Sequence, residues 1–147
     1  MILELLMLHF SKLTQTALAA MCRLGEAYGT HRLNAFAIAD ASHLPRPIVA
    51  KVLTYLAQAG LVSGTRGPGG GFQLTRAPEQ ISLGDIINVF EKCISLVEGK
   101  CLLGVSRCRL HGQCLLRIQH ALFQSQLNHL LQDNSLLSFI GRTCNPG

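Results

Sequence analysis

The sequence has few charged residues and no long apolar segment. Only 14% of its 147 residues are charged and 48% are hydrophobic, so we expect a substantial core and some apolar surface covered by a partner subunit. No apolar run reaches the roughly 18–20 residues needed to span a membrane. The apolar first nine residues contain Glu4 and lack a basic start and a cleavage site. We therefore expect a cytoplasmic protein with no membrane span and no signal peptide.

The sequence also lacks the motifs typical of enzymes. It has no Ser/His/Asp set, no phosphate-binding P-loop and no dinucleotide-binding glycine motif to accompany its six cysteines. No Cys-x2-Cys pair is present, which weakens the case for a zinc ribbon or a thioredoxin-type dithiol. In a reducing compartment such cysteines are expected to be reduced, metal-bound or redox-active. These absences favour a binding protein over a redox or metal-handling enzyme.

The net charge of +5 is unevenly distributed along the chain. Residues 1–78 contain seven Lys/Arg and three Asp/Glu, a net +4, whereas residues 79–147 contain six and five, a net +1. The excess is modest and would not by itself argue for nucleic acid.

Residues 44–74 predict a helix followed by a two-stranded hairpin. The helix places apolar residues on one face at spacings of three and four: Val49, Val52, Leu53 and Leu56. Gly60 suits the end of the helix, and alternation around Gln73 suits a returning strand. The tip between the strands reads Arg66-Gly67-Pro68-Gly69-Gly70-Gly71, with one positive charge and little bulk. A winged helix-turn-helix contacts DNA with such a pair, the helix in the major groove and the hairpin on the backbone or in the minor groove.

Two upstream helices complete the expected helix-turn-helix. Ser11 can cap a helix extending to Tyr28, and Asn34 can cap a short helix over residues 35–41. Phe36 and Ile38 are expected to point inward from the short helix. Residues 42–44 are expected to form the turn into the recognition helix.

The outer side of the recognition helix supplies the predicted DNA contacts. Arg46 is the predicted base reader, because a guanidinium can form two hydrogen bonds with guanine, and Lys51 is a predicted phosphate contact. The face has few hydrogen-bonding groups, so much of the specificity is expected from DNA shape or from the hairpin. The alternative for the helix residues is a solvated surface. The full predicted set is Pro45, Arg46, Pro47, Ala50, Lys51, Thr54, Arg66, Gly67, Pro68 and Gly69.

Residues 93–114 contain four of the six cysteines. Three glycines interrupt this segment, and it has no sustained helical or strand period. The spacing includes Cys101-x6-Cys108-x5-Cys114, and nearby Lys and Arg side chains favour thiolates. A bendable segment with several converging thiolates is what a metal or cluster site requires.

Two helices are expected around the cysteine segment. Ser82 and Asp85 are a plausible capping pair for a helix ending at Phe90. Residues 115–131 predict the longest helix, followed by a short helix that Asn134 would cap. The long helix has two apolar stripes, Leu116, Phe123, Leu127 and Leu130 on one and Leu115, Ile118 and Leu122 on the other. One stripe can face the chain's own domain and the other a second subunit.

The runs Ala59-Gly60-Leu61-Val62 and Arg66-Gly67-Pro68-Gly69-Gly70-Gly71-Phe72 resemble a known family. It is the family of bacterial winged-helix repressors that includes the iron–sulfur cluster regulator IscR and the nitric-oxide-sensitive repressor NsrR. The similarity spans roughly residues 11–140. It implies a homodimer formed by the long helix, a pseudo-palindromic double-stranded DNA operator, and an iron–sulfur cluster, 2Fe-2S or 4Fe-4S. The implied ligands are Cys101, Cys108 and Cys114, whose spacing is most like the nitric-oxide-sensitive branch.

Two other readings of the cysteine segment remain open. One is zinc, held by the same three cysteines with His111 or Cys93, and the other is a metal-free thiol switch or an inert loop. The resemblance also places Gln15 and Arg117 where the two branches carry their fourth ligand. Neither side chain is a good iron ligand, so a labile cluster is expected.

We therefore predict a mostly α fold, a winged helix-turn-helix with a small β wing and a long C-terminal dimerisation helix. The expected divisions are a DNA-binding domain at 11–78, a connecting helix at 79–92, a cysteine-rich sensor segment at 93–114 and dimerisation helices at 115–141. The predicted function is transcriptional regulation, with repression controlled by iron–sulfur status, nitric oxide or redox. A metal-free repressor controlled by a partner or by thiol oxidation is the alternative.

Overall fold

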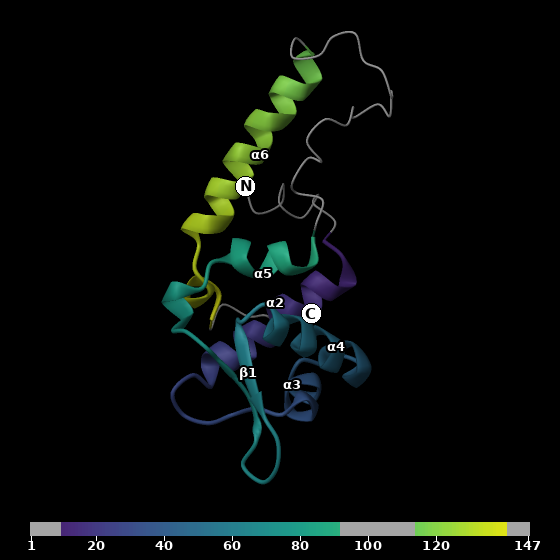
Figure 1. Ribbon diagram of the computed structural model, residues 1–147, viewed down its shortest axis with the longest axis vertical. Helices are drawn as coiled ribbons and strands as arrows, with labels where there is room; N and C mark the ends of the chain where they lie inside the picture. The colour runs from purple at the N-terminus through teal and green to yellow at the C-terminus, as the bar shows by residue number, and fades with distance from the viewer. Residues whose placement is uncertain (1–9, 92–113, 141–147) are drawn as a thin grey trace.

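The structure is a computed structural model that describes residues 10–91 and 114–140 (Figure 1). Its elements in chain order are helices α2 (Lys12–Glu26), α3 (Ala35–Ala41) and α4 (Arg46–Gln58), strands β1 (Val62–Thr65) and β2 (Gly71–Leu74), the 3-10 helix η1 (Pro78–Gln80), helices α5 (Leu83–Phe90) and α6 (Leu115–Asp133), and the 3-10 helix η2 (Leu136–Phe139). The predicted mostly helical fold with a small two-stranded wing is confirmed. No helix in the described ranges combines the length and the apolar character needed to cross a membrane.

The predicted helix starts are present as side-chain caps. The Ser11 hydroxyl accepts a hydrogen bond from the N–H three residues later at 3.3 Å, and the Asn34 side chain does the same at 2.7 Å. Ser82 and Asp85 form a reciprocal capping box at the start of α5, with distances of 3.0 and 3.1 Å. The first helix ends at Glu26, before the predicted end at Tyr28, whose side chain is 43% exposed.

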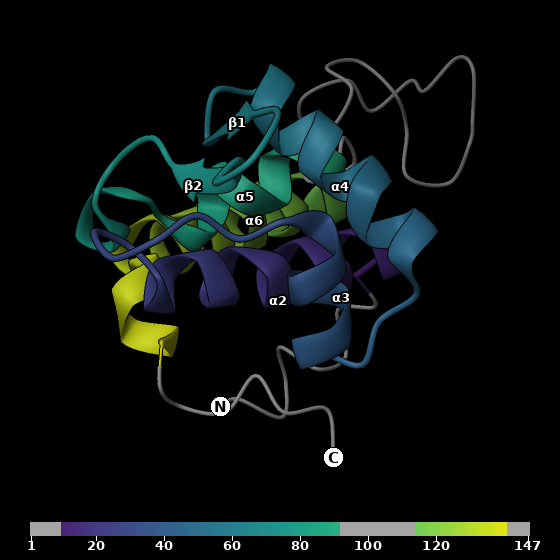
Figure 2. The ribbon, with the colours of Figure 1, turned by 90° about the horizontal axis from the view of Figure 1, so that it is seen from below.

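The core forms where α2 lies against α3 and α4, an arrangement visible from below in Figure 2. Buried side chains on these helices are Ala17, Ala20, Met21, Leu24, Ile38, Val49, Val52, Leu53 and Leu56. Cys22 is 3% exposed, as expected for a small buried side chain. The apolar stripe predicted for the recognition helix is therefore the face of α4 that holds it to the domain.

The hairpin is hydrogen-bonded to the segment that precedes α3. β1 and β2 pair antiparallel, with Val62 opposite Leu74. Leu33 adds a bridge to Phe72, donating to its carbonyl at 3.0 Å and accepting from its N–H at 2.7 Å. At Gly71, where φ is 137°, a Cβ would lie 2.8 Å from the Leu33 carbonyl carbon. This glycine therefore permits a close approach within the chain itself.

Among the described side chains of α6, those that pack on the domain lie in its C-terminal part. Leu127 and Leu131 are 8% and 3% exposed and pack in one cluster with Ile87 of α5. The predicted grouping of Leu127 with Phe123 and Leu130 was wrong, because those two side chains are 53% and 43% exposed. Leu127 and Leu131 are one helical turn apart and both contact the Ile87 cluster. Phe123 is also one turn from Leu127, so its exposure reflects its position further from that cluster along α6.

The predicted N-cap of the last short helix was also wrong. Ser135, not Asn134, precedes η2, and Asn134 is instead the C-cap of α6. Its side-chain N–H donates to the Leu130 carbonyl at 2.6 Å. The amide therefore satisfies the end of the preceding helix, because those last carbonyls lack partners within the helix.

Candidate nucleic-acid interface

The first turn of α4 is presented to solvent. Pro45 is its N-cap and makes no side-chain hydrogen bond, and the preceding turn has His43 in the left-handed region at φ 52°. The six residues predicted as DNA contacts on this helix are all exposed: Pro45, Arg46, Pro47, Ala50, Lys51 and Thr54. The structure therefore brings the predicted helix residues together on the side away from the core.

Arg46 does not extend freely into solvent. Its guanidinium carbon lies 3.7 Å from the centroid of the Phe36 ring on α3. Phe36 is 50% exposed, so the prediction that it faces inward was wrong, whereas Ile38 is fully buried as expected. Positions two apart point to different sides of a helix, so α3 could not bury both. Phe36 was predicted to face inward because an aromatic residue in a short apolar helix is usually part of the core.

Lys51 and Thr54, two other predicted DNA-contact residues of α4, make weaker contacts within the chain. The Lys51 ammonium lies 6.0 Å from the centre of the Tyr55 ring, at the limit of a cation–π contact. The Thr54 hydroxyl donates to the Ala50 carbonyl at 3.0 Å. Lys51 is thus available for a phosphate, while the Thr54 proton is already used inside the helix.

The wing tip is exposed from Arg66 to Gly69. Arg66, Gly67, Pro68 and Gly69 are exposed, and a Cβ added at Gly67 or Gly69 would meet nothing within 4 Å. Arg32, which the sequence did not single out, donates from Nη1 to the Thr65 hydroxyl at 3.1 Å and adds a cation beside the wing. Figure 1 shows the hairpin, α3 and α4 at the end of the molecule opposite to α6. Helix and wing can therefore face one duplex.

Replacing Arg66 with alanine is expected to weaken binding to specific and scrambled duplexes by similar factors. An exposed guanidinium at the wing tip can neutralise one phosphate, so the slope of log affinity against log salt should become shallower by about 1. Titrating duplexes at several salt concentrations measures this. Gln73→Ala, on β2 away from the tip, is the control, and an unchanged affinity of the Arg66 variant would remove the wing from the DNA contact.

The cysteine segment is described only at its end. Cys114 is the N-cap of α6 and is half-buried. Cys101 and Cys108, together with Cys93 and His111, lie outside the described residues. Within the described ranges no group of three or more His, Cys, Asp or Glu side chains could hold a metal. The predicted ligand set thus remains a prediction.

Glu91, the residue after α5, is hydrogen-bonded to the start of α2. Its Oε1 accepts from the Ser11 N–H at 2.7 Å and from the Thr14 hydroxyl at 2.6 Å. The hydrogen bond from Thr14 is the main cause that lowers the pKa of the Glu91 carboxyl below its ordinary value of 4.5, against an opposing effect of burial. Its partners are 80 and 77 residues away, so periodicity could not reveal them.

Glu91→Gln is expected to lower the free energy of unfolding at neutral pH by about 1 kcal/mol, the difference between charged and neutral hydrogen bonds. Because the folded pKa is lowered, this stabilisation is present above the ordinary pKa of 4.5 and is lost as pH falls through the folded value. Urea unfolding at pH 7 and at pH 3.5 measures it. Glu79→Gln, at an exposed residue of η1, is the control variant and is measured in the same way. An equal loss at both pH values would mean that the Glu91 charge is unimportant.

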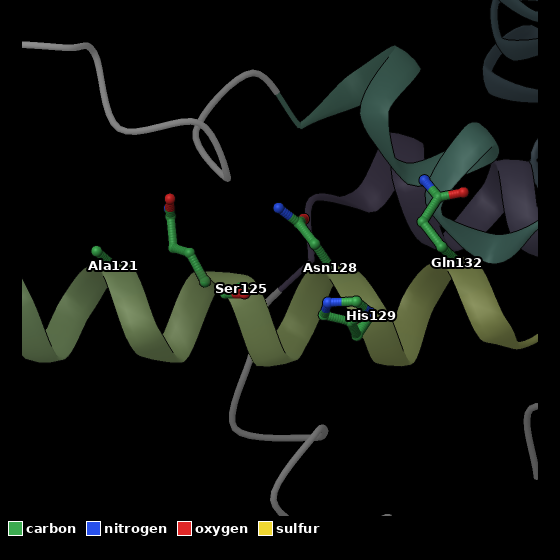
Figure 3. A pocket seen from close by; sticks show the side chains of 6 residues that line it. Ala121, Ser125, Asn128, His129 and Gln132 are labelled. Carbon is green, nitrogen blue, oxygen red and sulfur yellow. The ribbon is translucent and has the colours of Figure 1, made fainter.

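A shallow cavity of about 510 Å³ lies along one side of α6. Figure 3 shows the lining side chains that belong to the described part of the chain, all of them on α6: Ala121, Gln124, Ser125, Asn128, His129 and Gln132. Gln132 accepts a hydrogen bond from the Ser82 hydroxyl at 2.9 Å, which ties one end of the lining to the start of α5. The cavity lies on α6, remote from the α4–wing end, so we assign it no role in DNA binding.

The sequence profile of the Rrf2 family, described as iron-dependent transcriptional regulators, matches residues 10–142. A transcriptional repressor of Streptomyces coelicolor named NsrR is 31% identical over 111 residues, covering 75% of this chain and 73% of that protein. An HTH-type transcriptional regulator of Synechocystis is 45% identical over 58 residues, covering 40% of each chain. These names agree with the expectation of a regulator rather than an enzyme.

The solved structure of CymR, described as the global cysteine regulator of B. subtilis, has a TM-score of 0.74 and is 26% identical. The superposition covers 92% of this chain and 98% of CymR. The winged-helix family inferred from the sequence is thereby confirmed. The closer likeness of the cysteine spacing to the nitric-oxide-sensitive branch stays a prediction.

Proposed function

Because the chain belongs to the Rrf2 family of DNA-binding transcriptional regulators, we propose that it is a homodimeric repressor that senses iron–sulfur status, nitric oxide or redox through its cysteine segment. The observation that carries this proposal is the pairing of an exposed recognition helix and an exposed basic wing at one end of the fold. The sensing part rests on the iron-dependent description of the family and on the three closely spaced cysteines.

DNA binding would use α4 and the wing together. Arg46 and Lys51 offer charged donors from the first half of α4, and Arg66 offers one from the wing tip. Pro47 and Ala50 are small or apolar, so they let the helix approach base edges and thymine methyl groups without reading a donor pattern. Specificity would then come from few direct contacts together with DNA shape.

The donor set fits an iron–sulfur cluster. Cys101, Cys108 and Cys114 would hold it, and thiolates are the ligands that such clusters prefer. A bound cluster would supply irons that respond to oxygen, nitric oxide or electrons. Cys114 is half-buried and directly precedes α6, so any rearrangement of the cysteine segment acts on the first turn of this helix.

The outward side of α6 would form the dimer contact. Its exposed apolar side chains are Leu115, Ile118, Leu122, Phe123 and Leu130. A contiguous apolar face on one helix is stable in water when another subunit covers it. Two paired α6 helices would set the separation of the two recognition helices, and the state of the cysteine segment would bias that separation.

The test is to purify the protein anaerobically, record its visible spectrum and count iron and sulfide per chain. We expect a charge-transfer band with both elements, and salt-dependent binding to a duplex selected by the protein. Duplex binding without iron, sulfide or a band would favour the metal-free alternative. No sequence-selective binding under any condition would contradict the proposed function.

A metal-free repressor is the second candidate. CymR, whose structure matches 92% of this chain, is described as the global cysteine regulator of B. subtilis. In that case a partner or thiol oxidation would control DNA binding through the same segment. Sensitivity of DNA affinity to oxidant in iron-free protein would favour this candidate.

A further inference from the structure

The contact between Arg46 and Phe36 lies outside the buried core. Phe36 is half-exposed on α3, and the Arg46 guanidinium covers its ring at 3.7 Å. Within residues 10–91 and 114–140 the sole ion pair joins Arg23 and Glu26, and Arg46 makes no hydrogen bond. The nitrogen donors of Arg46 are thus available to a ligand.

A guanidinium carbon 3.7 Å from the ring centroid is close enough for the planar face of the group to stack on the ring. Stacking in this way would leave the N–H donors, which lie in the plane of the guanidinium, free at its edge. Guanine presents two acceptors in the major groove, and an arginine in this orientation can bind both with parallel hydrogen bonds. The ring therefore uses the part of Arg46 that does not read a base and leaves free the part that does.

The position of Arg46 in α4 strengthens this argument. It is the first residue of the helix, whose first turn contains no acidic side chain. Because a cation is electrostatically unfavourable near a helix N-terminus, α4 itself does not hold the Arg46 charge in place. A long flexible arginine at this point would also lose side-chain entropy on binding, unless a neighbour already restricts it.

We propose that Phe36 is a positioning residue that holds Arg46 ready to read a guanine in the major groove, and so determines sequence specificity. This inference rests on DNA binding by α4 as proposed above. Phe36 acts through the guanidinium and need not touch DNA. Since α3 supplies the ring and α4 the arginine, the reader is built by packing between the two helices of the helix-turn-helix.

The experiment begins with selection of preferred sequences from random duplexes by the full chain. Guanine preference is then the ratio of dissociation constants for the selected duplex and for duplexes with single G·C→A·T changes. Arg46→Ala should reduce the preference at one base pair per half-site by about 5- to 150-fold. Phe36→Leu, which keeps the bulk but loses the ring, should reduce the same preference by roughly two- to five-fold. Phe36→Tyr, which keeps the ring, should retain it.

A double variant separates positioning from other roles. If Phe36 works through Arg46, Phe36→Leu adds nothing to Arg46→Ala. Phe139→Leu, on the 40% exposed Phe139 of η2, is the matched control and should leave the preference unchanged. Thermal melts of each variant show that the fold is retained.

Three outcomes would overturn the inference while leaving the proposed function intact. Phe36→Leu could keep the full guanine preference, or could weaken selected and scrambled duplexes equally, or could add its loss to that of Arg46→Ala. An unmutated chain that enriches no sequence would instead contradict the proposed function and the inference together.

Discussion

Leu122→Asp is expected to separate the dimer into monomers and to weaken operator binding by about 10²–10⁴-fold, the gain that two linked half-sites supply. Leu122 is 61% exposed, and its neighbours on the same side, Leu115 and Ile118, are 67% and 48% exposed. Placing a carboxylate in the centre of this apolar side would bury an unpaired charge at the contact between subunits. Light scattering after size-exclusion chromatography measures the mass, and duplex titration measures the affinity.

Two further substitutions make this test specific. Asn128→Asp introduces the same charge at an exposed position that lines the polar side of α6, and it should leave the dimer intact. Leu127→Asp, on the other apolar stripe predicted for this helix, should instead lower the melting temperature, because Leu127 packs with Ile87. A monomeric unmutated chain, or a dimeric Leu122→Asp variant with normal affinity, would contradict the α6 interface.

A dimer should select DNA sites whose two half-sites have centres about 34 Å apart or a multiple of that distance.

Interactions between residues close together in the sequence made much of the fold predictable. The capping side chains of Ser11, Asn34 and Ser82 mark helix starts because they satisfy N–H groups within three residues. The spacing of apolar residues in α4 and the glycine-rich tip identify the recognition helix and the wing for the same reason. These signals need no knowledge of the rest of the chain.

The failures concern contacts between distant segments. Periodicity shows that α6 has apolar sides, but which side Ile87 covers depends on where α5 lies. The bridge between Leu33 and Phe72 and the Glu91 contacts with α2 likewise join residues far apart in sequence. Phe36 was misplaced because its aromatic ring is consistent with a core until Arg46 is seen above it.

For the candidate site, the sequence could identify exposed residue types but not their geometry. Arg46, Lys51 and Arg66 are exposed as predicted, and the DNA contacts themselves stay predictions. Arg32 was missed because a single arginine before α3 carries no motif. Its proximity to the wing follows from the Leu33–Phe72 bridge, which places Arg32 beside Thr65.

Alanine replacement of Cys101, Cys108 or Cys114 is expected to abolish the visible absorption of protein reconstituted anaerobically with iron and sulfide. Each substitution removes one thiolate from a set of three, and a cluster left with two protein ligands should not be retained. The measurement is the spectrum with iron and sulfide counts, compared with the unmutated chain. A spectrum unaffected by any of the three would exclude this ligand set.

The fourth ligand decides how stable the bound cluster is. Gln15, which the resemblance places at one branch's ligand position, is exposed and donates from Nε2 to the Phe10 carbonyl at 3.0 Å. A neutral amide is a poorer iron ligand than a carboxylate, and the guanidinium of Arg117 offers no acceptor. We therefore expect a cluster with one exchangeable position that decays rapidly in air.

Decay after exposure to air distinguishes the possible fourth ligands. Gln15→Ala, Cys93→Ala and His111→Ala should each change the decay rate little, because none is expected to bind iron strongly. Glu91→Gln is measured in the same way. The Glu91 carboxylate accepts a hydrogen bond from Thr14, the residue next to Gln15 in the first turn of α2. A sharp loss of the cluster in Cys93→Ala would mean four cysteine ligands. Such a closed site would be structural, because no iron would remain open to oxygen or nitric oxide.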